Sequence, residues 1–223
     1  MIKNIKYQVD AVKELVAKTR ELLEDSGTRK KLVFKAPTGS GKTVMASQML
    51  DELTTELEED GKEAAIIWIA PNKLHQQSYF RMKNYFSETR ALSPVMYDEL
   101  DHSIDGYIKP GEIFFVNWES INKDSNVMVR DSETSSSLYD LTRRTQEDHG
   151  LPIVVVIDEE HMFGGRYAKQ SEKVLATIQP KVEIRISATP ITANPDAMVT
   201  VLRSKVIEAQ MIKDGITINP KIT

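Results

Sequence analysis

The sequence predicts an α/β domain whose mostly parallel sheet carries helices on both faces. Short apolar runs typical of strands alternate along the chain with segments of helical periodicity. Two of these runs, residues 64–70 and 153–157, are apolar throughout, as expected of strands that helices cover on both faces. Strands that alternate with helices form βαβ units, and right-handed crossovers then distribute the helices over both faces of the sheet.

The first elements follow one another closely. Apolar residues from Ile5 to Leu23 recur at three-, four- and seven-residue steps, which predicts a helix that ends near Gly27. Residues 31–35 predict a short strand, and apolar spacing from Val44 to Leu57 predicts the next helix. The remaining predicted strands are residues 64–70, 94–97, 112–116, 153–157 and 182–187, with helices expected between them, including residues 138–147 and 168–178.

Composition is that of an ordinary globular protein. The 223 residues are 40% hydrophobic and 28% charged, which suits one large domain. Absence of cysteine excludes disulfides, thiol catalysis and cysteine-based metal sites. The longest apolar runs fall far short of the roughly 20 residues of a membrane span, so we expect a cytoplasmic protein without a membrane partner. A net charge of −4 leaves nucleic acid open as a partner, because a local groove can still track phosphates.

Two stretches interrupt this pattern. Residues 122–150 are polar and rich in Ser, Thr and Asp, which predicts an insertion. Residues 199–223 show mixed signals without a clear closing element, which predicts a linker. We therefore expect one domain over residues 1–198, with a linker after it.

A phosphate-binding loop stands between the first predicted strand and the second helix. Gly39 and Gly41 allow the backbone to curl its N–H groups around a polyphosphate. Lys42 brings a positive charge to the β- and γ-phosphates, and Thr43 offers a hydroxyl to Mg²⁺. The alternative is a glycine-rich turn that only joins a strand to a helix. The predicted nucleotide-binding residues of the loop are Thr38, Gly39, Ser40, Gly41, Lys42 and Thr43.

Four polar residues, Asp-Glu-Glu-His, follow the apolar run 153–157. Open α/β sheets bind their ligands at the carboxyl ends of strands. We expect Asp158 to hold Mg²⁺ and Glu159 to orient or deprotonate the attacking water. Glu160 is interpreted as a spacer or cap. The alternative for the whole group is a strand that runs into an acidic turn.

Three motifs, in this order and spacing, resemble those of superfamily 2 helicases. Residues 36–43 resemble motif I, with alanine at the first glycine of the generic pattern; residues 158–161 resemble the DExH motif II, and residues 187–190, Ser-Ala-Thr-Pro, match motif III. The resemblance implies a RecA-like P-loop NTPase fold that binds ATP with Mg²⁺. It also implies that His161, Ser187 and Thr189 couple nucleotide state to nucleic-acid binding.

Weaker similarities extend the site. Gln8 resembles an upstream glutamine that reads the adenine edge in this family. The alternative is that Gln8 is an isolated glutamine with no role in nucleotide binding. Residues 69–75 resemble motif Ia and residues 115–121 a motif Ib region, and both contact the nucleic-acid backbone in the family. The alternatives are a Pro-Asn turn and a tryptophan in the core. The residues carried over as nucleic-acid contacts are Pro71, Asn72, Lys73, Asn117 and Trp118.

The motif II spelling and the segment 206–220 look like the Res subunit of type III restriction enzymes. That resemblance implies an ATP-dependent DNA translocase with a second RecA-like domain, a nuclease domain and a methyltransferase partner subunit. RNA helicases and type I restriction motors of the same superfamily remain alternatives, as does a regulatory module that binds nucleotide without turnover. Because no second domain is recognised after Pro190, we expect this chain alone to hydrolyse ATP barely.

Overall fold

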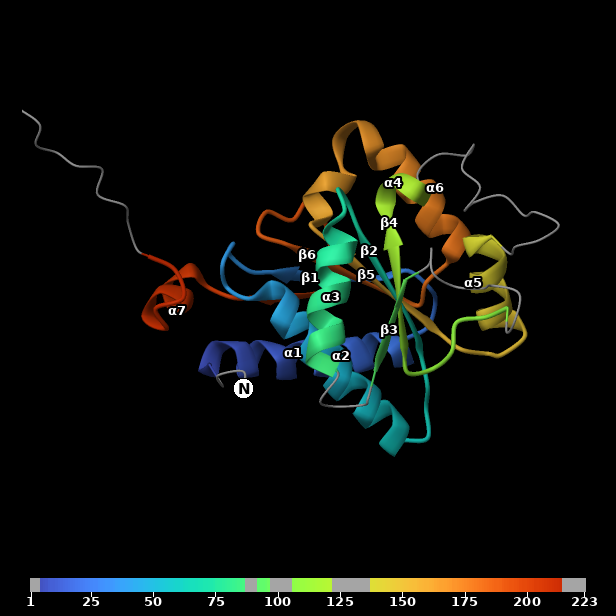
Figure 1. The fold of residues 1–223 in the computed structure, drawn as a ribbon, viewed down its shortest axis with the longest axis horizontal. Helices are drawn as coiled ribbons and strands as arrows, with labels where there is room; N and C mark the ends of the chain where they lie inside the picture. The colour runs from blue at the N-terminus through green and yellow to red at the C-terminus, as the bar shows by residue number, and fades with distance from the viewer. Residues whose placement is uncertain (1–4, 87–91, 97–105, 122–136, 214–223) are drawn as a thin grey trace, which may run out of the picture.

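A single parallel sheet organises the chain. The computed structural model describes residues 5–86, 92–96, 106–121 and 137–213. Seven strands within these ranges pair in the order β3-β4-β2-β5-β6-β1-β7, each with its neighbours in parallel, which confirms the predicted fold class. Figure 1 shows the sheet among its helices. The strands are β1 Lys30–Lys35, β2 Ala65–Ala70, β3 Ser93–Met96, β4 Glu112–Asn117, β5 Ile153–Asp158, β6 Val182–Ser187 and β7 Ala197–Thr200.

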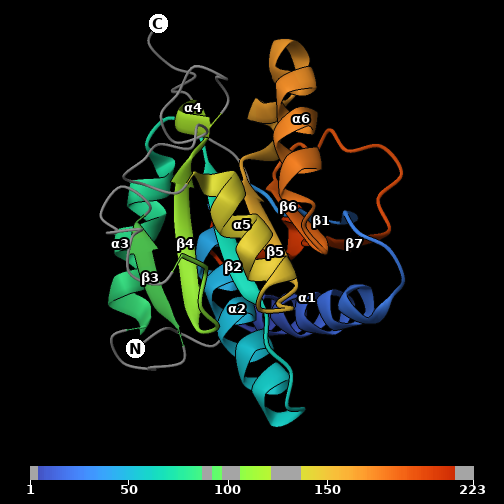
Figure 2. The ribbon, with the colours of Figure 1, turned by 90° about the vertical axis from the view of Figure 1, so that its right-hand side faces the viewer.

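Helices cover both faces of this sheet, as Figure 2 shows in side view. One face carries α1 Lys6–Glu24, α2 Lys42–Glu59 and α3 Leu74–Phe86; the other carries α4 Trp118–Ile121, α5 Leu138–Glu147 and α6 Ala168–Ile178. The short helix α7 Arg203–Glu208 follows β7, and the 3₁₀ turns Glu160–Phe163 and Gly165–Tyr167 precede α6. Across the described ranges, no helix combines the length and apolarity needed to cross a membrane.

Two cores form because successive strand residues point to opposite faces. In β2, Trp68 joins the core under α1 to α3, where its ring stacks on Phe115 at 5.9 Å between centroids. Its neighbour Ile67 joins the core under α5 and α6. All six residues of β2 and of β5 are buried, which is why these two strands read as continuous apolar runs.

Part of the predicted insertion belongs to this second layer. Helix α5 coincides with the predicted helix 138–147, and its residues Leu138 and Leu141 are buried against the sheet. The Ser137 hydroxyl accepts a hydrogen bond from the Asp140 N–H at 3.1 Å and so caps the helix start. Residues 122–136 of the predicted insertion, and Tyr97 of the predicted third strand, lie outside the described residues.

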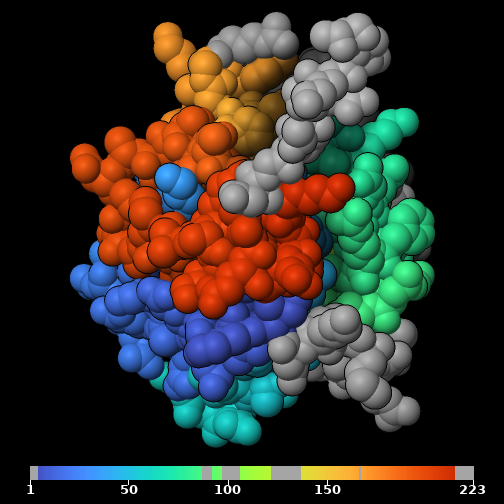
Figure 3. All heavy atoms as spheres, turned by 90° about the vertical axis from the view of Figure 1, so that its left-hand side faces the viewer, coloured from blue at the N-terminus to red at the C-terminus, as the bar shows by residue number. Residues whose placement is uncertain are grey.

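The sheet extends across the boundary expected at residue 198. Strand β7 pairs in parallel with β1, from Leu32 opposite Ala197 to Lys35 opposite Thr200. Val199, Val201 and Val206 are buried in the first core, so residues 199–209 pack on the domain rather than begin as a free linker. Figure 3 shows this segment in red against the blue residues of α1. The linker itself stays an expectation, and its residues 214–223 lie outside the described residues.

Candidate nucleotide-binding site

The strand order brings the three predicted motifs to one edge of the sheet. β6 lies between β1 and β5, with Lys35 opposite Ser187 and Asp158 opposite Ile186. The phosphate loop, the Ser-Ala-Thr segment and the acidic turn therefore follow three adjacent strand ends. The Ala36 N–H also donates to the Ser187 carbonyl at 3.2 Å, which joins the loop to the segment beside it.

The phosphate loop has the backbone that an anion cradle requires. Gly39 and Gly41 have φ of +82° and +88°, in the left-handed region that residues with a Cβ avoid. Helix α2 begins at Lys42, directly after Gly41, so the positive end of its dipole faces the loop. The Ser40 hydroxyl is buried without a hydrogen-bond partner. Backbone N–H groups that curl in this way at a helix N-terminus fit a triphosphate, whose oxygens would accept from them.

Opposite charges meet across the loop. Lys42 Nζ lies 3.8 Å from Glu159 Oε1, and the two side chains are 10% and 28% exposed. Glu159 has φ +53° and ψ +49°, a left-handed conformation that is uncommon outside glycine. Strained residues of this kind cluster at functional sites, where the surrounding structure maintains them. Glu159 thus combines a strained backbone with a carboxylate close to the lysine of the loop.

Asp158 ends β5 and is only 6% exposed. Burial, followed by the nearby Glu159 charge, raises the pKa of Asp158 to about 6; the Glu159 N–H, Lys42 and the Ser78 hydroxyl oppose the rise. The N–H contact measures 3.0 Å to Asp158 Oδ1. A buried carboxylate that is costly to ionise suits a cation ligand, because a bound Mg²⁺ would favour the charged form.

The donor set suits magnesium rather than a fully protein-built metal cage. Among the described residues, no three His, Asp or Glu side chains gather into a possible metal site. Mg²⁺ usually takes one or two protein ligands and fills its octahedron with phosphate oxygens and water. Thr43, in the first turn of α2, and Asp158 are the residues that would hold it beside a triphosphate.

The three predicted coupling residues form one chain of contacts. His161 Nδ1 lies 3.3 Å from Glu159 Oε2 and 3.1 Å from Ser187 Oγ. Ser187 Oγ also accepts the Thr189 N–H at 3.1 Å. The imidazole of His161 thus contacts both the Glu159 carboxylate and the Ser-Ala-Thr segment.

Gln8 is buried beside the phosphate loop, and its side-chain amide already donates to the loop backbone. Its Nε2 donates to the Ser40 carbonyl at 2.9 Å, and a Cβ added to Gly41 would lie 2.6 Å from that nitrogen. The Tyr7 hydroxyl donates to the same carbonyl at 2.7 Å. Recognition of adenine by Gln8 stays a prediction; the loop contact of Tyr7 was missed, because a tyrosine beside a glutamine carries no motif of its own.

The predicted nucleic-acid contacts fall at the ends of β2 and β4, which pair with Ala70 opposite Asn117. Asn72 and Lys73 are exposed and have φ of +51° and +61°. The Glu119 carboxylate accepts the Asn72 N–H at 3.1 Å, while the Asn117 side-chain oxygen accepts the Glu119 N–H at 3.0 Å. Pro71 is buried beneath this loop. Pro71, Asn72, Lys73 and Asn117 therefore lie at the same edge of the sheet. Of these four residues, only Asn72 and Lys73 are exposed.

Trp118 corrects the sequence analysis. Its side chain is 3% exposed and packs on Phe163 at 4.6 Å between ring centroids. The chain turns into α4 immediately after β4, and this turn directs the indole into the second core. The prediction that Trp118 contacts nucleic acid is therefore wrong, and the core alternative holds.

Glu160 lies behind the site, and its contacts go beyond the spacer or cap expected from the sequence. It is fully buried, and its carboxylate accepts the Ile191 N–H at 3.2 Å. The available signal lay in β6, where Glu183, Arg185 and Ser187 alternate with apolar residues although both faces of the strand are buried. Such alternation in a central strand indicates that a polar group packs against it.

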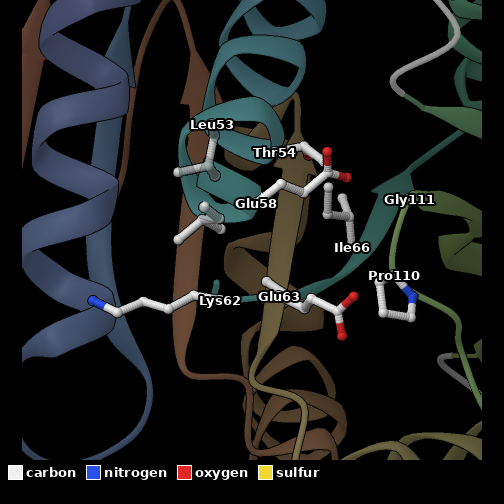
Figure 4. Close-up of a pocket in the computed structure, with 10 residues that line it drawn as sticks. Leu53, Thr54, Glu58, Lys62, Glu63, Ile66, Pro110 and Gly111 are labelled. Atoms are coloured by element: carbon white, nitrogen blue, oxygen red, sulfur yellow. The ribbon is translucent and has the colours of Figure 1, made fainter. Parts of the chain in front are cut away.

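A separate small pocket lies at the opposite end of the sheet (Figure 4). It forms near the start of β2 and of β4, away from the carboxyl ends where α/β sheets bind ligands. It contributes nothing to the nucleotide site. Its lining includes Leu53, Thr54, Glu58, Lys62, Glu63, Ile66, Pro110 and Gly111.

Comparison with known protein families identifies the family of this chain. A family model described as "Type III restriction enzyme, res subunit" matches residues 1–192. The chain belongs to this family. Membership confirms the resemblance drawn from the phosphate loop, the acidic turn and the Ser-Ala-Thr segment, all of which the matched range contains. No curated protein sequence matches the chain.

Three solved structures with a similar fold are each 14% identical to this chain. The Sulfolobus solfataricus SWI2/SNF2 ATPase core in complex with dsDNA matches 85% of the chain, with TM-score 0.54. The UvsW helicase from Bacteriophage T4 matches 90%, with TM-score 0.52. A nuclease-deletion mutant of the Type ISP restriction-modification enzyme LlaGI, in complex with a DNA substrate mimic, matches 94%, with TM-score 0.59. The chain spans 32%, 61% and 21% of these proteins, respectively.

Proposed function

We propose that this domain binds and hydrolyses ATP as the motor domain of a DNA translocase of the type III restriction class. The observation that carries the proposal is the convergence of Lys42, Asp158 and Glu159 at the ends of β1 and β5, the two strands that flank β6, with 3.8 Å between Lys42 Nζ and Glu159 Oε1. A phosphate cradle facing a cation ligand and a base is the arrangement that hydrolysis of a γ-phosphate needs.

In the proposed reaction, the phosphate loop holds the triphosphate and Lys42 neutralises charge on its β- and γ-oxygens. Mg²⁺ held by Thr43 and Asp158 would supply further positive charge to the same oxygens. The Glu159 carboxylate orients a water for in-line attack and accepts its proton as the bond to the γ-phosphorus forms. The bond to the β-phosphate oxygen breaks, and ADP and inorganic phosphate leave.

We further propose that catalysis is completed by a second RecA-like domain. In related P-loop hydrolases an arginine supplied from outside the domain contributes roughly 10³- to 10⁵-fold in rate. The isolated chain should accordingly hydrolyse ATP slowly. A nuclease domain and a methyltransferase subunit are the partners expected of the whole protein. DNA is preferred over RNA as the track, because two of the similar solved structures are described as complexes with DNA or a DNA mimic.

The test compares ATP hydrolysis by the full-length protein with duplex DNA, single-stranded RNA or no nucleic acid. We expect stimulation by DNA, and we expect Lys42→Ala to weaken ATP binding roughly 10- to 100-fold, the value of a charge-assisted contact to phosphate. Stimulation by RNA alone would favour the RNA helicase alternative. ATP binding without turnover under every condition would favour the regulatory module.

A further inference from the structure

A group of buried charged side chains lies beside the acidic turn, on the face of β6 that α6 covers. Glu160 and Glu183 are fully buried and Arg185 is 8% exposed. Hydrolysis as proposed uses none of them. Because buried charges lose the solvation of water, they persist only where each one is paired.

Arg185 connects the members of this group. Its Nε donates to Glu183 Oε2 at 3.0 Å, and Arg29 Nε donates to Glu183 Oε1 at 2.7 Å. On its other side Arg185 donates to the Thr192 hydroxyl oxygen at 3.0 Å and lies 3.5 Å from Glu160 Oε1. Arg185 is thus shared between a buried carboxylate of β6 and one of the acidic turn.

Glu160 ties the acidic turn to the chain that follows the Ser-Ala-Thr segment. Its Oε2 accepts the Ile191 N–H at 3.2 Å, and its Oε1 accepts the Thr192 hydroxyl. A second contact lies nearby, since a Cβ added to Gly164 would lie 2.5 Å from Ile191 Cδ1. The contact of His161 with Ser187 also joins the acidic turn to this part of the chain, at the start of the Ser-Ala-Thr segment.

We infer that Glu160 is a positioning residue that locks residues 187–192 to the acidic turn, so that the two segments shift together when nucleotide binds. The inference rests on the proposed function. Glu160 directly follows the proposed base Glu159, while Ile191 and Thr192 come two and three residues after Thr189, a proposed coupling residue. A buried carboxylate that bonds both a backbone N–H and a hydroxyl fixes one relative position of two loops, which an apolar side chain of similar size cannot do.

The experiment measures backbone hydrogen–deuterium exchange over residues 187–193 in the full-length protein, without nucleotide and with Mg²⁺ and a non-hydrolysable ATP analogue. Glu160→Gln keeps the side-chain volume and removes the charge. We expect roughly tenfold faster exchange of this segment without nucleotide, and loss of the protection that nucleotide induces there in the wild type. Affinity for the analogue should stay within about threefold, since Glu160 is placed outside the nucleotide contacts. DNA-stimulated kcat should fall roughly tenfold at unchanged KM for ATP.

Two further variants separate positioning from stability. Thr192→Val removes one donor to Glu160 from a half-buried position and should shift exchange of residues 187–193 in the same direction, by a smaller factor. Thr145→Val is the matched control for Thr192→Val: it removes a fully buried hydroxyl of α5 whose partners are the Leu141 carbonyl and the Ile108 N–H. It should lower the melting temperature and leave the exchange of residues 187–193 unchanged.

Wild-type exchange rates in both Glu160→Gln and Thr192→Val would overturn the inference, as would equal loosening by Thr145→Val. If Glu160→Gln does not fold, Thr192→Val decides alone. If the wild-type protein binds no nucleotide, the proposed function is refuted. The exchange rates measured without nucleotide would still test whether Glu160 holds the two segments together.

Discussion

Replacing Asp158 by Asn should stabilise the metal-free protein at neutral pH. Asp158 is 6% exposed, and burial together with the Glu159 charge raises its pKa from the ordinary 3.8 to about 6. Each unit corresponds to about 1.4 kcal/mol, so ionised Asp158 lowers the free energy of unfolding by up to about 3 kcal/mol. Asparagine has nearly the same shape and carries no charge to bury.

The sign of the pH dependence follows from linkage. Below about pH 4 the carboxyl is protonated in both states, and the variant should gain nothing. Between about pH 4 and pH 6 the unfolded chain releases its proton first, so the free energy of unfolding of the wild type falls as pH rises. The advantage of Asp158→Asn should therefore grow through this window and level off above pH 6.

Urea unfolding followed by circular dichroism, without divalent metal and at several pH values from 4 to 7.5, measures the effect. Asp148→Asn, at an exposed position, is the control and should give no pH-dependent gain. A variant that gains equally at pH 4.5 and pH 7.5, or loses stability at pH 7.5, would refute the reasoning. In the wild type, protons should also compete with Mg²⁺, weakening its binding about tenfold for each pH unit below 6.

Three other changes test the site. Glu159→Gln should leave ATP affinity unchanged and slow hydrolysis by roughly 10²- to 10⁴-fold; normal turnover would mean that another group is the base. Gln8→Ala should lower the preference for ATP over GTP in competition binding, and equal preference in wild type and variant would exclude adenine reading. Gly41→Ala places a Cβ 2.6 Å from Gln8 Nε2 at φ +88°, and should cost about 1–2 kcal/mol and weaken ATP binding. Gly61→Ala is the control, at φ +68° with nothing within 4 Å of the added Cβ. It should lower the free energy of unfolding and leave ATP affinity unchanged.

The sequence predicts the strands well where burial is complete on both faces. β2 and β5 are recognisable because every residue faces a helical layer, so an apolar run is the only pattern that fits. β7 gives no such signal: only Val199 of its four residues is buried, because it lies at the edge of the sheet. An edge strand that forms by pairing with β1 alone cannot be recognised from its own residues.

Side-chain direction is the part of the site that local sequence does not determine. A motif places Trp118 at the end of a strand, but the turn into α4 decides that the indole enters the core. Glu160 is equally ambiguous beside Glu159, because its partners lie about thirty residues later in the chain, at Ile191 and Thr192. Only the register of β6 against β5 brings these residues together.

The edge strand β7 also has a mechanical consequence. Residues 197–200 pair in parallel with Leu32 to Lys35 of β1, and the Val201 N–H donates to the Lys35 carbonyl at 2.8 Å. A pull on the chain beyond Val201, directed along the strand, loads these bonds together in shear rather than opening them one at a time. The force then enters the sheet through β1, the strand whose next residues are the phosphate loop. A load on β7 is therefore borne first by the strand that leads directly into the phosphate loop.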